Sequence, residues 1–228
     1  RASKVIVGEE HSNVAHHDIE LWLIKSLQQQ RPQGSVLLEM LDIDQQEAVN
    51  RVKHAVQSGT SMREARIQTA LNWKTGWPWP LYRDVVMTTL AGEYPLLAAN
   101  ISREKVGELY REPTYPEGER SRDRSVQHAL TAVIFLMHKG DIEPEQLRAM
   151  LSIQQHRDRF MAEQLMAAPA PALLIAGGYH AAKDVGVPVH LADLNAEKPV
   201  VLMLSTTGTT LSQAQADYIW FVPANAKK

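Results

Sequence analysis

Apolar and polar positions along the chain form blocks that predict strands and helices in turn. Short β-branched or leucine-rich runs indicate buried strands, and longer runs with apolar residues three and four apart indicate amphipathic helices. Strands are predicted at 4–8, 35–40, 94–100, 172–176, 187–191, 199–205 and 218–222. Helices are predicted at 17–30, 44–58, 62–71, 81–91, 103–111, 125–139 and 144–168, with loops at 73–80 and 112–124.

Strands that alternate with helices are typical of an α/β protein with a mainly parallel sheet flanked by helices. The stretch from about 103 to 168 contains predicted helices only, so we expect a helical region in the second half of the chain. The chain has 228 residues and no internal repeat, which favours a single α/β domain over 1–228.

Composition narrows the possible functions mainly by what it excludes. The chain has no cysteine, which excludes disulfides, thiolate metal ligands and cysteine nucleophiles. Lys plus Arg number 24 and Asp plus Glu number 26, and the resulting net charge of -2 does not favour nucleic acid as a partner. Val5 already has the character of a core strand, so we expect a signal peptide and a lipid anchor to precede Arg1.

Polar residues follow the predicted strands at their carboxyl ends. Two strands lead into the same pattern, Gly-x-x-His, at Gly8–His11 and at Gly177–His180. Ligands of open α/β sheets bind beyond the carboxyl ends of the strands, so we expect these groups to converge at one edge. The other polar residues at predicted strand ends are Glu9, Glu10, Glu39 and Asn100.

Histidine beside carboxylate suits either a general base with an orienting partner or a hard or borderline metal ion. If the chain is an enzyme, the residues expected to carry the chemistry are Glu9, Glu10, His11, Glu39 and His180. In the alternative interpretation the histidines only bind loop backbone, and Glu39 forms a salt bridge, for example with Arg157.

Aromatic residues offer a second kind of chemistry. Trp73, Trp77, Trp79 and Tyr82 could line a flat ligand, although packing of this loop onto the domain surface is the favoured interpretation. Tyrosinate is a hard anionic ligand suited to ferric haem iron, and a neighbouring cation favours the ligating form. The remaining tyrosines of interest are Tyr110 before Arg111, Tyr115 in the charged loop, and Tyr179 inside the second Gly-x-x-His pattern.

Several short motifs in collinear order resemble the ChaN-like haem-binding family of iron-regulated lipoproteins. This family belongs to a wider group with the erythromycin esterases and the Tiki/TraB proteins. The matching motifs are Gly8–His11, Glu39-Met40 with Gln45 or Gln46, Trp77 with Tyr82, Ala99-Asn100, Arg157-Asp158 with Met161-Ala162, Ile175–Gly177 with His180, and Gly186–Pro188.

The resemblance implies haem binding for bacterial iron uptake or storage, without catalysis, in a periplasmic or outer-membrane-anchored lipoprotein. It implies a homodimer in which two haems stack face to face, with a tyrosine of one subunit on each iron. A histidine and a lysine of the other subunit would hold the propionates. Chain order favours Tyr110 as the iron ligand, then Tyr115; Tyr179, His180 and Arg157 are further candidates for contact with haem.

Two other functions remain open at this point. One is a metal-dependent, esterase-like hydrolase that uses the paired Gly-x-x-His segments. The other is a partner of a haem transporter, such as an outer-membrane haem receptor, that docks through the charged loop at 117–124. The sequence leaves open whether the polar cluster and a haem site coincide.

Overall fold

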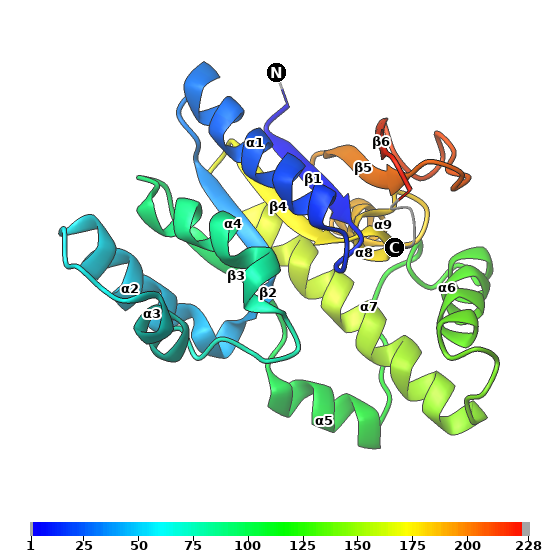
Figure 1. Ribbon diagram of the computed structural model, residues 1–228. Helices are drawn as coiled ribbons and strands as arrows, with labels where there is room; N and C mark the ends of the chain where they lie inside the picture. The colour runs from blue at the N-terminus through cyan, green and yellow to red at the C-terminus, as the bar shows by residue number, and fades with distance from the viewer. Residues whose placement is uncertain (1, 225–228) are drawn as a thin grey trace.

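Six strands form one sheet in the order β3-β2-β4-β1-β5-β6 in the computed structural model, which describes residues 2–224 (Figure 1). Every neighbouring pair of strands is parallel, and this confirms the predicted α/β fold with a mainly parallel sheet. The strands are β1 Lys4–Glu9, β2 Ser35–Asp42, β3 Leu96–Asn100, β4 Ala172–Gly177, β5 Val200–Thr206 and β6 Tyr218–Val222.

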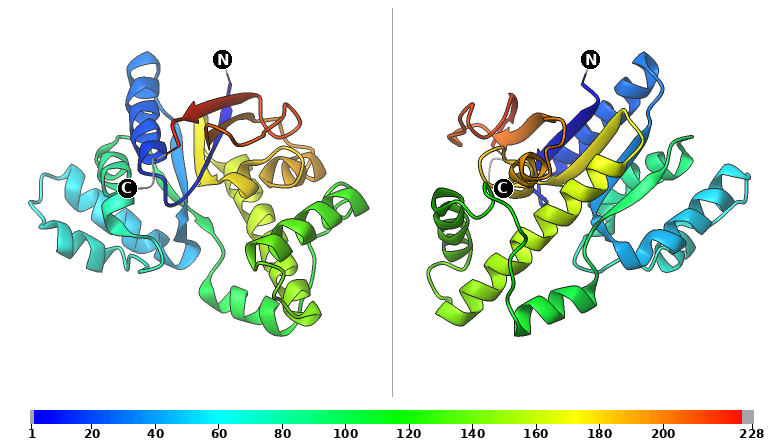
Figure 2. Two further views of the ribbon diagram at one scale, coloured as in Figure 1. Left: turned by 45° about the vertical axis from the view of Figure 1, so that its right-hand side comes forward. Right: turned by 180° about the vertical axis from the view of Figure 1, so that it is seen from behind.

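Helices connect these strands and cover both faces of the sheet (Figure 2). Their bounds are α1 Val14–Gln30, α2 Gln46–Gln57, α3 Glu64–Ala70, α4 Trp79–Ala91, α5 Arg103–Arg111, α6 Arg124–Met137, α7 Pro144–Ala167, α8 Gly178–Ala181 and α9 Val187–Asp193. A short 3-10 helix, Ile43–Gln45, precedes α2. None of the helices in the described part of the chain combines the length and the apolar character needed to cross a membrane.

Two apolar layers hold the helices to the sheet. Val7 and Ile175 point to the face covered by α1, α2, α3 and α4. Ile6 and Leu174, one position earlier in the same strands, point to the face covered by α6, α7, α8 and α9. Both faces of the central strands are therefore buried, which explains their nearly continuous apolar sequence.

The chain connections form a topological switch point at the carboxyl ends of β1 and β4. The connection from β1 leads through α1 to β2, whereas the connection from β4 leads through α8 and α9 to β5, on the other side of β1. Neighbouring strands whose connections leave in opposite directions form a topological switch point, the usual ligand site of such sheets. Glu9 and Gly177, paired in register, are the last residues of the two strands there.

The strand predicted at 187–191 is wrong, because this segment is helix α9. Val187, Val189 and Leu191 alternate as in a strand, but His190 between them is buried too, so the alternation does not separate two faces. Pro188 lies in the first turn of the helix, where its missing N–H costs nothing. In this segment the position of Pro188 therefore indicates the helix better than the alternation of apolar residues indicates a strand.

The predicted helical region at 103–168 contains α5, α6 and α7. In Figure 1, α5, α6 and one end of α7 extend beyond the sheet. The assignment of residues 1–228 to a single domain remains a prediction.

A buried lysine fixes α2 against the carboxyl end of α4. Lys53 Nζ donates to the backbone oxygens of Thr89 at 2.9 Å and Leu90 at 3.2 Å, and also to that of Gly92. The last carbonyls of a helix lack partners within the helix and carry partial negative charge, so an ammonium group satisfies both needs.

Replacing Lys53 with methionine should lower the free energy of unfolding by about 2–3 kcal/mol, because several buried carbonyls lose a charged donor while the apolar stem is kept. Urea denaturation followed by circular dichroism measures this change. Lys25→Met, at an exposed position of α1, is the matched control and should change stability by less than about 0.5 kcal/mol. Equal effects of the two substitutions would contradict a capping role for Lys53.

Candidate functional site

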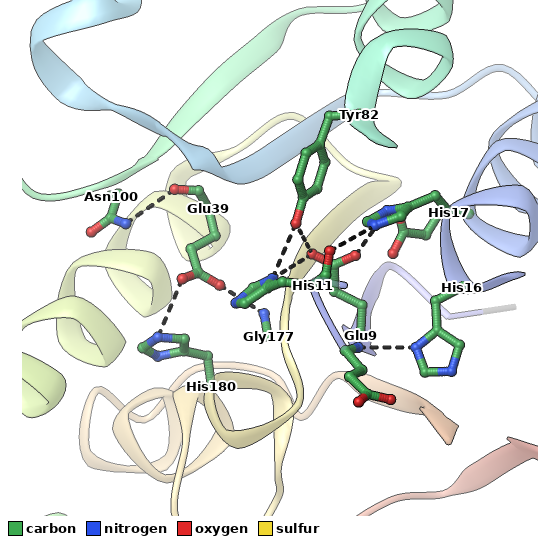
Figure 3. Close-up of polar contacts among 11 residues, drawn as sticks. Glu9, His11, His16, His17, Glu39, Tyr82, Asn100, Gly177 and His180 are labelled. Carbon is green, nitrogen blue, oxygen red and sulfur yellow. Dashed lines mark hydrogen bonds and ion pairs between the residues drawn. The ribbon is translucent and has the colours of Figure 1, made fainter. Parts of the chain in front are cut away.

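Glu9 lies at the centre of a buried polar network at the end of β1 (Figure 3). Its Oε1 is 2.7 Å from His11 Nδ1 and accepts a hydrogen bond from the Tyr82 hydroxyl at 2.9 Å. Its Oε2 is 3.1 Å from Nδ1 of His17. One carboxylate therefore joins the loop after β1 with α1 and α4.

His17 and Glu20 extend this network along the buried face of α1. His17 Nδ1 lies 3.2 Å from Glu20 Oε2, and His17 Nε2 lies 3.1 Å from the backbone oxygen of His11. Burial disfavours the charged form of His17, but Glu20 and Glu9 outweigh it and raise the pKa of His17 to about 10.

The pKa values of the two carboxylates in this network are shifted in opposite directions. Burial opposes the charge of Glu9, but hydrogen bonds from His11, His17 and Glu20 prevail and lower the pKa of Glu9. Burial and the neighbouring charge of Glu9 raise the pKa of Glu20 well above its usual range, although His17 opposes the shift. At neutral pH the group therefore contains an ionised Glu9 and a cationic His17, and the pKa shift of Glu20 favours its protonated form.

A second network begins at Glu39, near the end of β2. Glu39 Oε2 accepts the backbone N–H of Gly177 at 2.7 Å, and Oε1 lies 3.4 Å from His180 Nε2. The other ring nitrogen of His180 is 2.6 Å from Asp158 Oδ1 on α7. Asn100 donates to the backbone oxygen of Glu39 at 3.1 Å, which ties β3 to the same edge.

Charge pairing controls the protonation of this second network. Burial disfavours an imidazolium, yet Glu39 and Asp158 raise the pKa of His180 to about 10. Burial also opposes the charge of Glu39, but His180, His11 and the Gly177 N–H lower the pKa of Glu39 to about 2. Burial raises the pKa of Asp158 to about 6, against the effect of His180. A buried cation thus lies between two carboxylates at neutral pH.

His11 is the accessible member of the site. Its side chain is 40% exposed, and its ring stacks edge-on against Trp77 with the centroids 4.8 Å apart. Nδ1 is oriented by Glu9, while Nε2 has no hydrogen-bond partner among residues 2–224. A Cβ at Gly177 would lie 2.8 Å from Nε2, so only glycine lets the ring lie this close to the strand end.

The structure brings four of the predicted site residues together: Glu9, His11, Glu39 and His180. Glu10 is different, because its side chain is exposed and lies near Asn13, with 3.5 Å between Glu10 Oε2 and Asn13 Nδ2.

Arg157 does not form the salt bridge considered for Glu39, whose partner is His180. The Arg157 charge instead acts on Asp158, where it opposes the rise in pKa that burial causes, and Arg157 Nε is buried without a hydrogen-bond partner in the described chain.

The tyrosine candidates lie on three separate segments. Tyr110 on α5 is 47% exposed, and Tyr179 on α8 is 50% exposed. Tyr115, between α5 and α6, donates from its hydroxyl to the backbone oxygen of Arg148 at 3.3 Å, and burial raises the pKa of Tyr115. Tyr82 is fully buried beside Glu9, and burial with this negative charge raises the pKa of Tyr82 strongly. Tyr110 and Tyr179 are thus the candidates with accessible phenols.

The tryptophan loop packs against the protein, as the favoured interpretation predicted. Trp73 stacks edge-on against Trp79 at 5.2 Å and lies 6.1 Å from the Tyr82 ring. Trp77 reaches both Tyr82 and His11, so this loop also forms one wall of the site.

Two central residues, His17 and Glu20, were missed by the sequence analysis. The helix predicted at 17–30 rests on the spacing of its apolar residues, but one of these, Trp22, is 53% exposed. The buried face actually includes His17, Glu20 and Ile24. The spacing of these three residues could have revealed the buried face. The histidine and the glutamate are three residues apart and the isoleucine follows four residues later, so all three share one helix face.

Replacing His180 with glutamine should lower the free energy of unfolding at pH 6 by about 3–5 kcal/mol, because Glu39 and Asp158 lose their buried cation. The His180 pKa is about 10 in the folded state against 6.5 without the fold. The stabilising contribution of His180 is therefore complete below pH 6.5 and disappears as the pH rises through 10.

The difference between this variant and the wild type should accordingly narrow from pH 6.5 to pH 10, as measured by urea unfolding at several pH values. His128→Gln, at an exposed position of α6, is the control and should behave as the wild type. A difference that stays constant over this range would show that His180 is not held as a cation.

Comparison with known proteins agrees with this fold and these motifs. The model of the family described as "Haem-binding uptake, Tiki superfamily, ChaN" matches residues 1–191. A solved structure described as "Cofacial heme binding to ChaN of Campylobacter jejuni" is 28% identical, with a TM-score of 0.87, over 96% of this chain and 86% of that one. No curated protein matches the sequence.

A more distant structural neighbour is an erythromycin esterase mutant in its open conformation. It is 13% identical, with a TM-score of 0.54, over 91% of this chain and 71% of that one, which shows a shared fold alone. The family match, in contrast, covers most of the chain and includes both Gly-x-x-His segments. This protein therefore belongs to the haem-binding ChaN family of the Tiki superfamily.

Proposed function

We propose that this protein binds haem for iron or haem uptake or storage, with the iron held by a tyrosine and two copies joined across the bound haems. The observation that carries the proposal is the similarity, over 96% of the chain, to a protein whose structure is described as binding cofacial haem. Membership of a family described by haem-binding uptake supports it.

Accessible phenols fit such a role. A tyrosine that ligates iron must be reached by the ligand and must lose its proton, and burial opposes both for Tyr82 and Tyr115. Tyr110 is exposed in the last turn of α5 next to Arg111, so a ligand can reach its phenol. We therefore assign the iron ligand to Tyr110, with Tyr179 as the alternative.

A cleft between α5 and α7 offers groups of the kind that hold propionates. Its volume is about 540 Å³, within the usual range for small-molecule sites. Lys105, His156 and Arg159 line it, and an ammonium, an imidazole and a guanidinium can all donate to carboxylates. The apolar residues that line the same cleft are Ile43, Ile101, Pro116 and Phe160, and the carboxylates of Glu117 and Glu163 line it as well.

The cellular setting is part of the same proposal. A haem-uptake role suits the cell envelope, as a periplasmic or outer-membrane-anchored lipoprotein that receives haem from an outer-membrane receptor. The loop at 117–124 supports such docking, since it is charged and largely exposed.

Titration of the purified protein with hemin should give a saturable Soret band with a high-spin, tyrosinate-like ferric spectrum, and sedimentation should show dimer formation as the band saturates. Tyr110→Phe should abolish this spectrum. Tyr218→Phe removes a phenol that is 65% exposed on β6 and should leave it unchanged.

The outcomes separate the two assignments. Loss of the spectrum in Tyr179→Phe but not in Tyr110→Phe would move the iron to the edge of the sheet beside His180. A wild-type protein that gives no saturable spectrum and remains monomeric would overturn the haem proposal.

Hydrolysis is a second candidate function, and one observation favours it. Glu9 orients His11 through Nδ1, and Nε2 has no hydrogen-bond partner among residues 2–224 on a side chain that is 40% exposed, which suits a general base. A water or alcohol at Nε2 could lose its proton to His11, while cationic His180 lies nearby to stabilise developing negative charge.

If the site is hydrolytic, the protein should hydrolyse an activated ester such as p-nitrophenyl acetate, and His11→Ala should reduce the rate about a hundredfold. His54→Ala, at an exposed position of α2, should retain the wild-type rate. Equal rates in the three proteins would exclude this function for His11.

A further inference from the structure

A compact group of potential metal ligands lies beneath His11, between the end of β1 and α1. Glu9, His17 and Glu20 each offer one ligand atom, and these atoms lie within 4.8 Å of one another. All three residues are buried, and none is more than 5% exposed. Figure 3 shows Glu9 and His17 pointing toward one another across this space.

The hydrogen bond of His17 selects the tautomer that suits a metal. Nε2 lies 3.1 Å from the backbone oxygen of His11, and a carbonyl can only accept, so Nε2 carries the hydrogen. In the neutral ring the lone pair then lies on Nδ1, which faces Glu9 Oε2 at 3.1 Å and Glu20 Oε2 at 3.2 Å. Metal-ligating histidines usually donate their other N–H to a carbonyl or carboxylate in this manner.

The charges and the hydrogen bonds of this group both favour a bound cation. Two carboxylates face one imidazole in a buried space, so positive charge has to be supplied either by protons or by a metal ion. Glu20 Oε1 is buried and has no hydrogen-bond partner within residues 2–224. A cation between the three residues gives this carboxylate a second partner.

We propose that Glu9, His17 and Glu20 form a buried site for one divalent transition-metal ion such as Zn²⁺. Zinc takes imidazole nitrogen and carboxylate oxygen at about 2.0–2.2 Å, which places tetrahedral ligand atoms about 3.4 Å apart. The separations of 3.1 Å and 3.2 Å from His17 Nδ1 to Glu9 and Glu20 are close to this value. Mg²⁺ and Ca²⁺ prefer oxygen ligands alone, and the nitrogen of His17 therefore favours a transition metal.

Such an ion would have a structural effect on the exposed site. It would tie α1 to the end of β1 and hold Glu9, which in turn orients His11 and binds Tyr82. The site is separate from the exposed phenols of Tyr110 and Tyr179, so the proposal stands independently of haem binding.

The test is titration of chelator-treated, hemin-free protein with Zn²⁺ by calorimetry, with elemental analysis after desalting. We expect one equivalent of zinc and a rise in the melting temperature on binding. Glu20→Gln retains the shape of the protonated acid, and it should weaken zinc binding at least tenfold without lowering the melting temperature of the metal-free protein. Asp18→Asn, an exposed change on α1, should bind zinc as the wild type does.

The proposal is overturned if the wild type retains less than about 0.2 equivalents of zinc, or if Glu20→Gln binds it equally well. The latter result would place zinc on surface histidines and leave the buried group neutralised by protons. If Glu20→Gln fails to fold, Glu20→Met takes its place, because it removes the ligand and keeps the His17 cation beside Glu9; unchanged zinc affinity in that variant overturns the proposal equally.

Discussion

Neutralisation of Glu9 and Glu39 is the constraint on which the rest of this structure depends. Both carboxylates lie near the ends of central strands, and both are almost completely buried. An isolated buried carboxylate would cost several kcal/mol, so each needs a cation and hydrogen-bond donors close by. His17 serves Glu9, and His180 serves Glu39.

These pairings explain how the elements around this edge of the sheet are placed. His17 requires α1 to pass over the end of β1, and His180 requires α8 to turn immediately after β4. Asp158 adds α7 through its contact with His180. A Cβ at Gly8 would lie 2.7 Å from the Cβ of Ala181, which shows how closely the short helix α8 lies over β1.

Much of this arrangement could be predicted from the sequence, because it follows from strand order alone. In a parallel sheet, the residues after each strand reach the same edge, and this brought His11 and His180 into one prediction. Helix α9 was harder to predict from the sequence, because a helix that is buried on several sides shows no clear hydrophobic periodicity. His17 and Glu20 were missed because polar residues on a buried helix face contradict the rule used to find that face. The choice between Tyr110 and Tyr179 depends on a ligand and a second copy, which a single chain does not specify.

The position of β4 in the sheet has a consequence for how the protein is made. β4 lies between β1 and β2, yet its residues 172–177 follow those strands by more than a hundred positions. A chain that emerges from the ribosome amino end first therefore exposes two apolar strands that cannot join each other directly. Long-range parallel pairing of this kind is slow and vulnerable to aggregation. The nascent chain should thus depend on holding chaperones until residues 172–177 have been synthesised.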